Sequence, residues 1–140
     1  MNEGLFRAVY VSAASHDLSD EELAAILDVS RRNNAARDIT GALAYHDLAF
    51  VQVLEGPEAA VEALLVTIAR DPRHTEVTIF DRSRVDERLF GSWSMGWLRA
   101  SALKRAGFDP GTLFLRDSPS EVVNAMFEAF RLSVRLASTP

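Results

Sequence analysis

The stretch LAFVQVLEG, residues 48–56, decides the fold, because it has the pattern of a buried strand with one polar side chain in its middle. The residues on both sides of Gln52 are apolar, and a short run of this kind is typical of a strand covered on both faces. An amide left without partners in an apolar layer costs about 1–3 kcal/mol. The strand therefore raises the question of what Gln52 binds.

Four further strands are predicted around this one. ITGALAY (39–45) precedes it and forms a hairpin with it through the short turn HDLA. FRAVYVS (6–12) is rich in β-forming residues and predicts a first strand, on one face of which Tyr10 lies. TEVTIF (75–80) and WSMGWLR (93–99) predict a fourth and a fifth strand, separated by a charged connection.

A helix is predicted between the first two strands. Ser19 and Glu22 have the spacing of a capping box, in which two side chains satisfy backbone N–H groups of the first turn. An amphipathic period then continues to about Asn34. The shared face of this helix begins apolar and ends polar, in the order Leu23, Ile26, Leu27, Ser30 and Asn34.

A second helix is predicted to begin at Gly56 and Pro57, since proline is favoured at the first helical position. It ends at Asp71-Pro72, because the residue before a proline avoids the helical region. Its apolar stripe consists of Val61, Leu64, Leu65 and Ile68.

The predicted order is β-α-β-β-α-β with an added fifth strand, which is the ferredoxin-like arrangement of α+β proteins. Right-handed crossovers place both helices on one face of the sheet, and we expect them to set the first and third strands parallel. Tyr10 and Gln52 would then lie on neighbouring strands.

The segment after the fifth strand is predicted to cover the other face of the sheet. Residues 102–117 have the composition of a loop, and Ser118 and Glu121 then form a second capping box. We divide the chain into a domain of residues 1–100 and an extension of residues 101–140. The last helix packs on its own sheet or on a partner through the apolar stripe Val123, Met126, Phe127, Phe130 and Val134.

Composition excludes several classes of function. The 140 residues carry a net charge of −5, which disfavours general binding to nucleic acid or to anionic membranes. There is no cysteine, and no apolar run approaches the ~18 residues of a membrane span. The N-terminal segment lacks the features of a signal peptide, so we expect a cytoplasmic protein. His16, His46 and His74 are too scattered to predict a metal site.

Four polar residues on inward faces are the candidates for function: Tyr10, Ser30, Asn34 and Gln52. Their hydroxyl and amide groups donate and accept hydrogen bonds but carry no charge at pH 7. Such a set suits a flat, uncharged heterocycle with amide-like edges, and it contains neither a general base nor metal ligands. Each residue alone also has an ordinary structural explanation, as a paired strand amide, a helix cap or a core tyrosine.

Taken together, these residues resemble the BLUF family, the blue-light sensors that use FAD. The resemblance covers residues 8–98, most of the chain. It implies a flavin between the two helices in a photoreceptor that is not an enzyme; the flavin is FAD, with FMN and riboflavin left open. A short member of this kind would act through a separate partner protein. The resemblance leaves open whether it forms a homo-oligomer. The matching stretches are VYVSAAS, SRRNNAARDITGALAY, FVQVLEGP, ARDPRH and FGSWSMGW.

The resemblance also implies roles for individual residues. Tyr10 matches the tyrosine that gives an electron and a proton to the excited flavin, and Gln52 matches the glutamine between that tyrosine and the flavin. Trp93 and Met95 match a pair on the fifth strand that rearranges upon signalling. The implied flavin contacts are Asn33 and Asn34 on the polar ring edge, Ile26, Ser30 and Ile68 in the walls, and Asp71, Arg73 and His74 at the mouth.

The sequence departs from the family pattern at two loops, where Asp38 and the turn HDLA stand in place of the usual glycines. Three alternatives to a working photoreceptor remain. They are a ferredoxin-like binding module without photochemistry, a flavin protein that no longer signals, and an acylphosphatase-like hydrolase. The hydrolase would need an anion-cradling loop with an arginine after the first strand, and VSAASHD has none.

Overall fold

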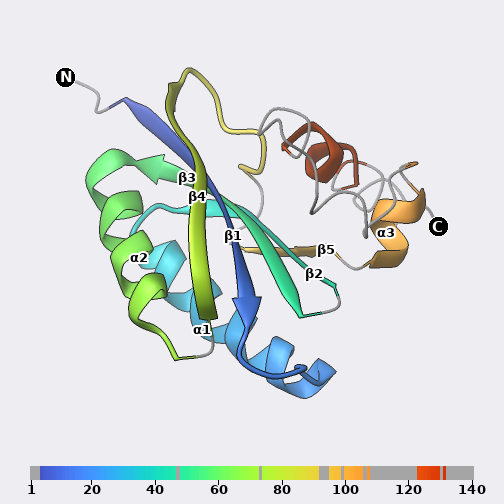
Figure 1. The fold of residues 1–140 in the computed structure, drawn as a ribbon. Coiled ribbons are helices and arrows are strands. Elements are labelled where there is room, and N and C mark those ends of the chain that lie inside the picture. The colour runs from blue at the N-terminus through green and yellow to red at the C-terminus, as the bar shows by residue number, and fades with distance from the viewer. Residues whose placement is uncertain are drawn as a thin grey trace.

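The computed structural model describes residues 4–46, 48–72, 74–91, 95–98, 100–105, 107, 123–129 and 131. Residues 123–129 are helical and follow the last labelled element of the chain. The labelled elements are β1 (Leu5–Ala14), α1 (Asp20–Ala36), β2 (Thr40–His46), β3 (Ala49–Pro57), α2 (Glu58–Arg70), β4 (His74–Val85), β5 (Gly96–Leu98) and α3 (Ala100–Arg105) (Figure 1).

The described strands form one sheet in the order β4-β1-β3-β2-β5, and the fold is the α+β, ferredoxin-like arrangement predicted from the sequence. The capping box that begins α1 is present: the Ser19 hydroxyl accepts from the Glu22 N–H, and the Glu22 carboxylate accepts from the Ser19 N–H, both at 3.1 Å. Two backbone N–H groups at the start of α1 are thereby satisfied.

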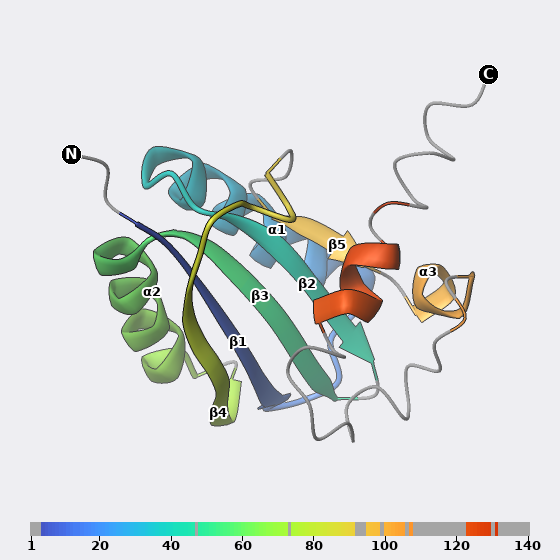
Figure 2. The same cartoon turned by 90° about the horizontal axis from the view of Figure 1, so that it is seen from above.

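The expectation that the first and third strands run parallel is wrong. β1 pairs antiparallel with β3, and β2 also pairs antiparallel with β3. A right-handed crossover sets parallel the two strands that it joins, which here are β1 and β2. β3 fills the gap between them as the hairpin partner of β2, so it runs opposite to both (Figure 2).

The helices α1 and α2 lie on one face of the sheet, as predicted (Figure 1). The alternation along β3 places Phe50 and Leu54 in a buried cluster with Leu27 of α1 and Leu65 of α2. Tyr10 of β1 belongs to the same cluster. The inward face of the sheet is therefore the face on which both helices pack.

The opposite face of the sheet has its own buried cluster. Val51 and Val53 of β3 lie in it together with Leu103 of α3 and with Val123 and Met126 of the last described helical residues. This part of the last helix thus packs on its own sheet. The second capping box, Phe130 and Val134 lie outside the described residues, and the division at residue 100 stays a prediction.

β4 is longer than the predicted strand. β4 continues through residues 81–85, which pair with residues 5–9 of β1, and its Arg82 and Arg84 side chains lie 3.0 Å from Glu62 and 3.2 Å from Glu58 of α2. A charged segment is therefore an edge strand in this fold. β5 lies within the predicted strand, of which residues 93, 94 and 99 are outside the described residues, and the helix α3 replaces the first residues of the predicted loop. Alanine, leucine, lysine and arginine in α3 are good helix formers.

The two loops without the usual glycines adopt left-handed backbone conformations. Asp38 has a φ of 59° and Leu48 a φ of 70°. Aspartate tolerates this region better than most residues, and Arg88 also stabilises that turn by donating to the Asp38 carbonyl at 2.9 Å. Gly41 is required for a different reason, since a Cβ there would lie 1.9 Å from the Val53 carbonyl oxygen.

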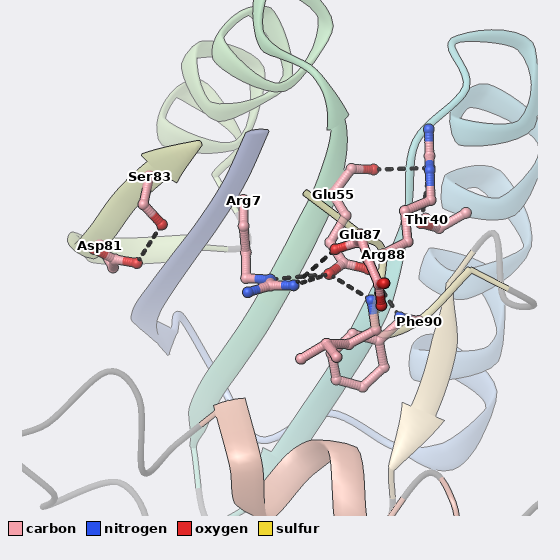
Figure 3. Close-up of polar contacts among 9 residues, drawn as sticks. Arg7, Thr40, Glu55, Asp81, Ser83, Glu87, Arg88 and Phe90 are labelled. Carbon is pink, nitrogen blue, oxygen red and sulfur yellow. Dashed lines mark hydrogen bonds and ion pairs between the residues drawn. The ribbon is translucent and has the colours of Figure 1, made fainter. Parts of the chain in front are cut away.

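The connection between β4 and β5 is tied to the sheet by a buried carboxylate (Figure 3). Glu55 is fully buried and accepts from the backbone N–H groups of Leu89 at 2.9 Å and Phe90 at 2.8 Å. Arg7, its neighbour on β1, donates Nε to the same carboxylate at 2.9 Å. Arg88 adds bonds to Thr40 and to the Glu55 carbonyl. These contacts fix the path of the chain shortly before Met95.

Candidate functional site

A cavity of about 120 Å³ lies between α1, α2 and the inward face of the sheet. This volume far exceeds the roughly 10–15 Å³ that a single water molecule requires. It brings together the predicted residues of both helices and both central strands. The lining residues are Tyr10, Ile26, Val29, Ser30, Asn33, Asn34, Leu43, Phe50, Gln52, Leu64, Thr67, Ile68 and Asp71.

Tyr10 and Gln52 lie side by side in the floor of the cavity. They are direct partners in the register of β1 and β3, and both side chains are buried. The Tyr10 hydroxyl donates to Oε1 of Gln52. Nε2 of Gln52 donates to the sulfur of Met95 at 3.0 Å. The two ends of the amide thus have different partners, which answers the question raised by the strand sequence.

The protonation state of Tyr10 is fixed by its surroundings. Burial raises the pKa of the Tyr10 phenol far above its usual value, and the carboxylate of Asp71, at the edge of the cavity, raises this pKa further. Tyr10 is therefore a neutral phenol throughout the physiological pH range. A neutral phenol that loses an electron also loses its proton readily, because the oxidised phenol is strongly acidic.

The walls of the cavity combine apolar and amide surfaces. Ile26 of α1 faces the cavity together with Leu64 and Ile68 of α2. Asn33 and Asn34 lie on the last turns of α1, and Asn34 is buried. The C-cap of α1 is Arg37, so Asn34 lies inside the helix and is not the capping residue. Flat apolar walls with uncharged amides at one end suit an aromatic heterocycle with carbonyl and N–H edges.

The comparison with known families decides the identity of this site. The family model described as "BLUF: Sensors of blue-light using FAD" matches residues 5–96. The chain belongs to the BLUF family. Blue-light sensing with a bound flavin is thus its function class, and this match supports the photoreceptor over the binding module without photochemistry. The cavity between α1 and α2, lined by apolar and amide side chains with Asp71 at its edge, fits the flavin.

Relatives of this BLUF chain are light-regulated proteins. It is 41% identical to the photoactivated adenylate cyclase subunit beta of Euglena gracilis over 87 aligned residues. These residues make up 61% of this chain and 10% of that protein. The chain spans about a tenth of the length of the curated relatives it matches. The cyclase activity in the names of these relatives therefore refers to the whole, longer proteins.

Solved BLUF structures have the same fold. The dark-state structure of the BLUF protein BlrB matches with a TM-score of 0.81 and 30% identity, over 94% of this chain and 98% of that chain. Klebsiella pneumoniae BlrP1, in a structure with FMN and cyclic diGMP, matches with a TM-score of 0.65 and 34% identity, over 69% of this chain and 26% of that chain.

The structure describes only some of the remaining predicted site residues. Met95 is buried and its sulfur accepts from Gln52, whereas Trp93 and Arg73 lie outside the described residues. His74 is the first residue of β4, at the register position opposite Ala14. Their roles toward the flavin and in signalling stay predictions.

Five lining residues were not predicted. Two of them carry a readable signal, since Phe50 shares the inward face of β3 with Gln52, and Leu64 belongs to the apolar stripe of α2. The others depend on tertiary packing, which places Val29, Leu43 and Thr67 at the rim or floor of the cavity.

Two further observations concern the described residues alone. Within them, no group of three or more histidine or carboxylate side chains is arranged to hold a metal ion. The helices among them are too short or too polar to cross a membrane.

Proposed function

We propose that this chain senses blue light through a hydrogen-bond relay of Tyr10, Gln52 and Met95. The single observation that carries the proposal is the buried chain of bonds from the Tyr10 hydroxyl to Gln52 Oε1 and from Gln52 Nε2 to the Met95 sulfur. When bound, FAD supplies the absorption of blue light and the acceptor for an electron and a proton. Tyr10 gives both and later takes both back, so no net oxidation remains.

The amide of Gln52 stores the effect of light because its two ends differ. While Tyr10 lacks its proton, Oε1 has lost its donor, and rotation of the amide turns Nε2 toward the phenol oxygen. After the phenol recovers its proton, a rotated amide presents Oε1 to the Met95 sulfur, and two acceptors cannot bond each other. A tautomeric change of the amide would also alter both contacts. In either case, Gln52 offers the flavin a different donor, which shifts its absorption to the red.

The signal leaves the cavity through β5. This strand pairs with β2 only from Ala42–Gly96 to Ala44–Leu98, so it is the most weakly held edge among the described strands. Leu98 packs in the same cluster as Val123 and Met126 on the opposite face of the sheet. A shift of Met95 therefore has a direct packing route to the last helix, which we propose is the bistable element.

The other cavity residues bind the flavin in this proposal. Asn33 and Asn34 bond the polar edge of the ring, and Ile26, Ser30 and Ile68 form its walls. Asp71, Arg73 and His74 contact the ribityl and phosphate part. We propose FAD as the cofactor, with FMN and riboflavin as alternatives. The family description supports FAD, and one structural relative is described with FMN.

We further propose that output passes to a separate protein and that this chain is not itself an enzyme. The match to BlrB over almost the full length of both chains supports a sensor unit of this size. A homo-oligomer and the cytoplasmic location remain predictions.

Gln52→Leu is expected to retain the flavin and to lose the light-induced red shift completely. Leucine has a similar volume but neither donates nor accepts, so the relay is cut at its centre while the cavity stays filled. The measurement is the difference between absorption spectra recorded in the dark and after blue light. Leu64→Met is the control, because it changes a cavity wall at similar volume without touching the relay. A normal red shift in Gln52→Leu would overturn the relay.

A further inference from the structure

Met95 is held at two points that come from different parts of the fold. Its sulfur accepts from Nε2 of Gln52 on β3 at 3.0 Å, and its backbone carbonyl accepts from Nε of Arg31 on α1 at 2.8 Å. Met95 is buried, and the three residues of β5 follow it directly. The two bonds together fix both the side chain and the backbone of the residue at the start of β5.

Arg31 is well placed to connect the flavin cavity with this strand. It follows Ser30, which lines the cavity, and it precedes Asn33 and Asn34, which line the cavity one turn later. Because successive helical residues point about 100° apart, Arg31 leaves the cavity wall and reaches toward the edge of the sheet. β5 forms that edge beside α1 (Figure 2).

We propose that Arg31 is a positioning residue that holds the start of β5 in its dark arrangement and accelerates the thermal return from the lit state. This inference rests on the proposed function. When the Gln52 amide changes, the Met95 sulfur loses its donor, and the Arg31 bond is then the remaining described tether of Met95 to the cavity. This bond keeps the Met95 backbone close to its dark position while the sulfur has no donor, so it favours the return.

The neighbouring arginine provides a matched control. Arg32 lies on the same helix and pairs with Asp28 at 3.3 Å, with side chains that are 71% and 73% exposed. An exposed pair of this kind contributes little and has no contact with β5 in the described residues. Arg31 and Arg32 thus differ in what they touch and not in charge or local helix propensity.

The test compares Arg31→Gln, Arg31→Lys and Arg32→Gln with the wild type in the flavin-bound protein. After a blue-light pulse, the decay of the red shift in the dark gives the recovery rate. We expect Arg31→Gln to slow recovery by about three- to tenfold, the effect of one typical hydrogen bond on a rate. Arg31→Lys, which keeps a cationic donor, and Arg32→Gln should stay within about twofold of the wild type. The red shift itself should be unchanged in all variants.

A second readout separates positioning from general stability. Amide hydrogen exchange of Gly96–Leu98 in the dark should be faster in Arg31→Gln and unchanged in Arg32→Gln, because only Arg31 restrains the start of β5. Recovery of Arg31→Gln at the wild-type rate would overturn the proposal, and so would equal slowing in Arg32→Gln or loss of flavin from Arg31→Gln. A wild-type protein without any red shift would instead contradict the proposed function on which this inference rests.

Discussion

Tyr10→Phe is expected to bind flavin normally and to show no red shift under blue light. The substitution removes a single oxygen from a fully buried ring, so the packing of the cavity floor is preserved. The phenylalanine has no O–H to give a proton with the electron, and Oε1 of Gln52 loses its donor. The light reaction therefore has no starting step. The measurement is the same spectral comparison, made at full flavin occupancy.

The chain offers a matched control for this variant, because it contains only two tyrosines. Tyr45 donates to Asp17 at 2.8 Å, accepts from the Leu18 N–H at 3.1 Å and packs on Phe50, with the ring centroids 4.9 Å apart. Tyr45 does not line the cavity. Tyr45→Phe should therefore keep the full red shift and lose only stability, by about 1 kcal/mol. A full shift in Tyr10→Phe would mean that the electron and proton come from elsewhere.

Glu55→Ala is expected to cause the largest loss of stability among single substitutions of polar residues, about 3–5 kcal/mol in the free energy of unfolding. The alanine leaves Arg7, whose side chain is only 15% exposed, without its buried partner. It also removes the acceptor for two backbone N–H groups, at Leu89 and Phe90. Chemical denaturation of the flavin-bound protein, followed by circular dichroism, measures the effect.

A surface ion pair serves as the control for Glu55. Glu58 and Arg84 lie 3.2 Å apart with side chains 48% and 78% exposed, so Glu58→Ala should cost about 0–1 kcal/mol. Glu55→Gln keeps the shape of the side chain and provides a milder variant if Glu55→Ala does not fold. Its red shift should persist, since this network contacts the loop before Phe90 and not the cavity. Equal stability of Glu55→Ala and Glu58→Ala would show that the buried network contributes nothing.

Local patterns explain why much of the fold is predictable from the sequence. The capping box at Ser19 is a short-range signal, and the hairpin of β2 and β3 follows from two β-forming runs with a short turn between them. The direction of β1 against β3 was predicted wrongly, although the crossover rule sets β1 parallel to β2 and the hairpin then makes β3 antiparallel to both. The length of β4 was missed because its Arg82 and Arg84 look like loop residues, and only the pairing of this segment with β1 makes it a strand.

Some features of the candidate site are also predictable from the sequence, and others are not. Tyr10 and Gln52 stand out because polar side chains are unusual on inward faces, and the family resemblance pairs them. The bond from Gln52 to the Met95 sulfur joins positions far apart in the chain, and no spacing rule predicts it. The role of Glu55 is even harder to predict, because in the sequence Glu55 looks like the polar end of a strand. Its partners are Arg7, Leu89 and Phe90, which the sequence does not connect.

The visible absorption spectrum of the purified protein, recorded in the dark and again after blue light, tests the central claim most directly. The account predicts a yellow protein whose flavin absorption shifts slightly to the red under blue light and returns in the dark. A colourless protein that takes up no added flavin would contradict it, and so would a flavin-bound protein whose spectrum does not change with light.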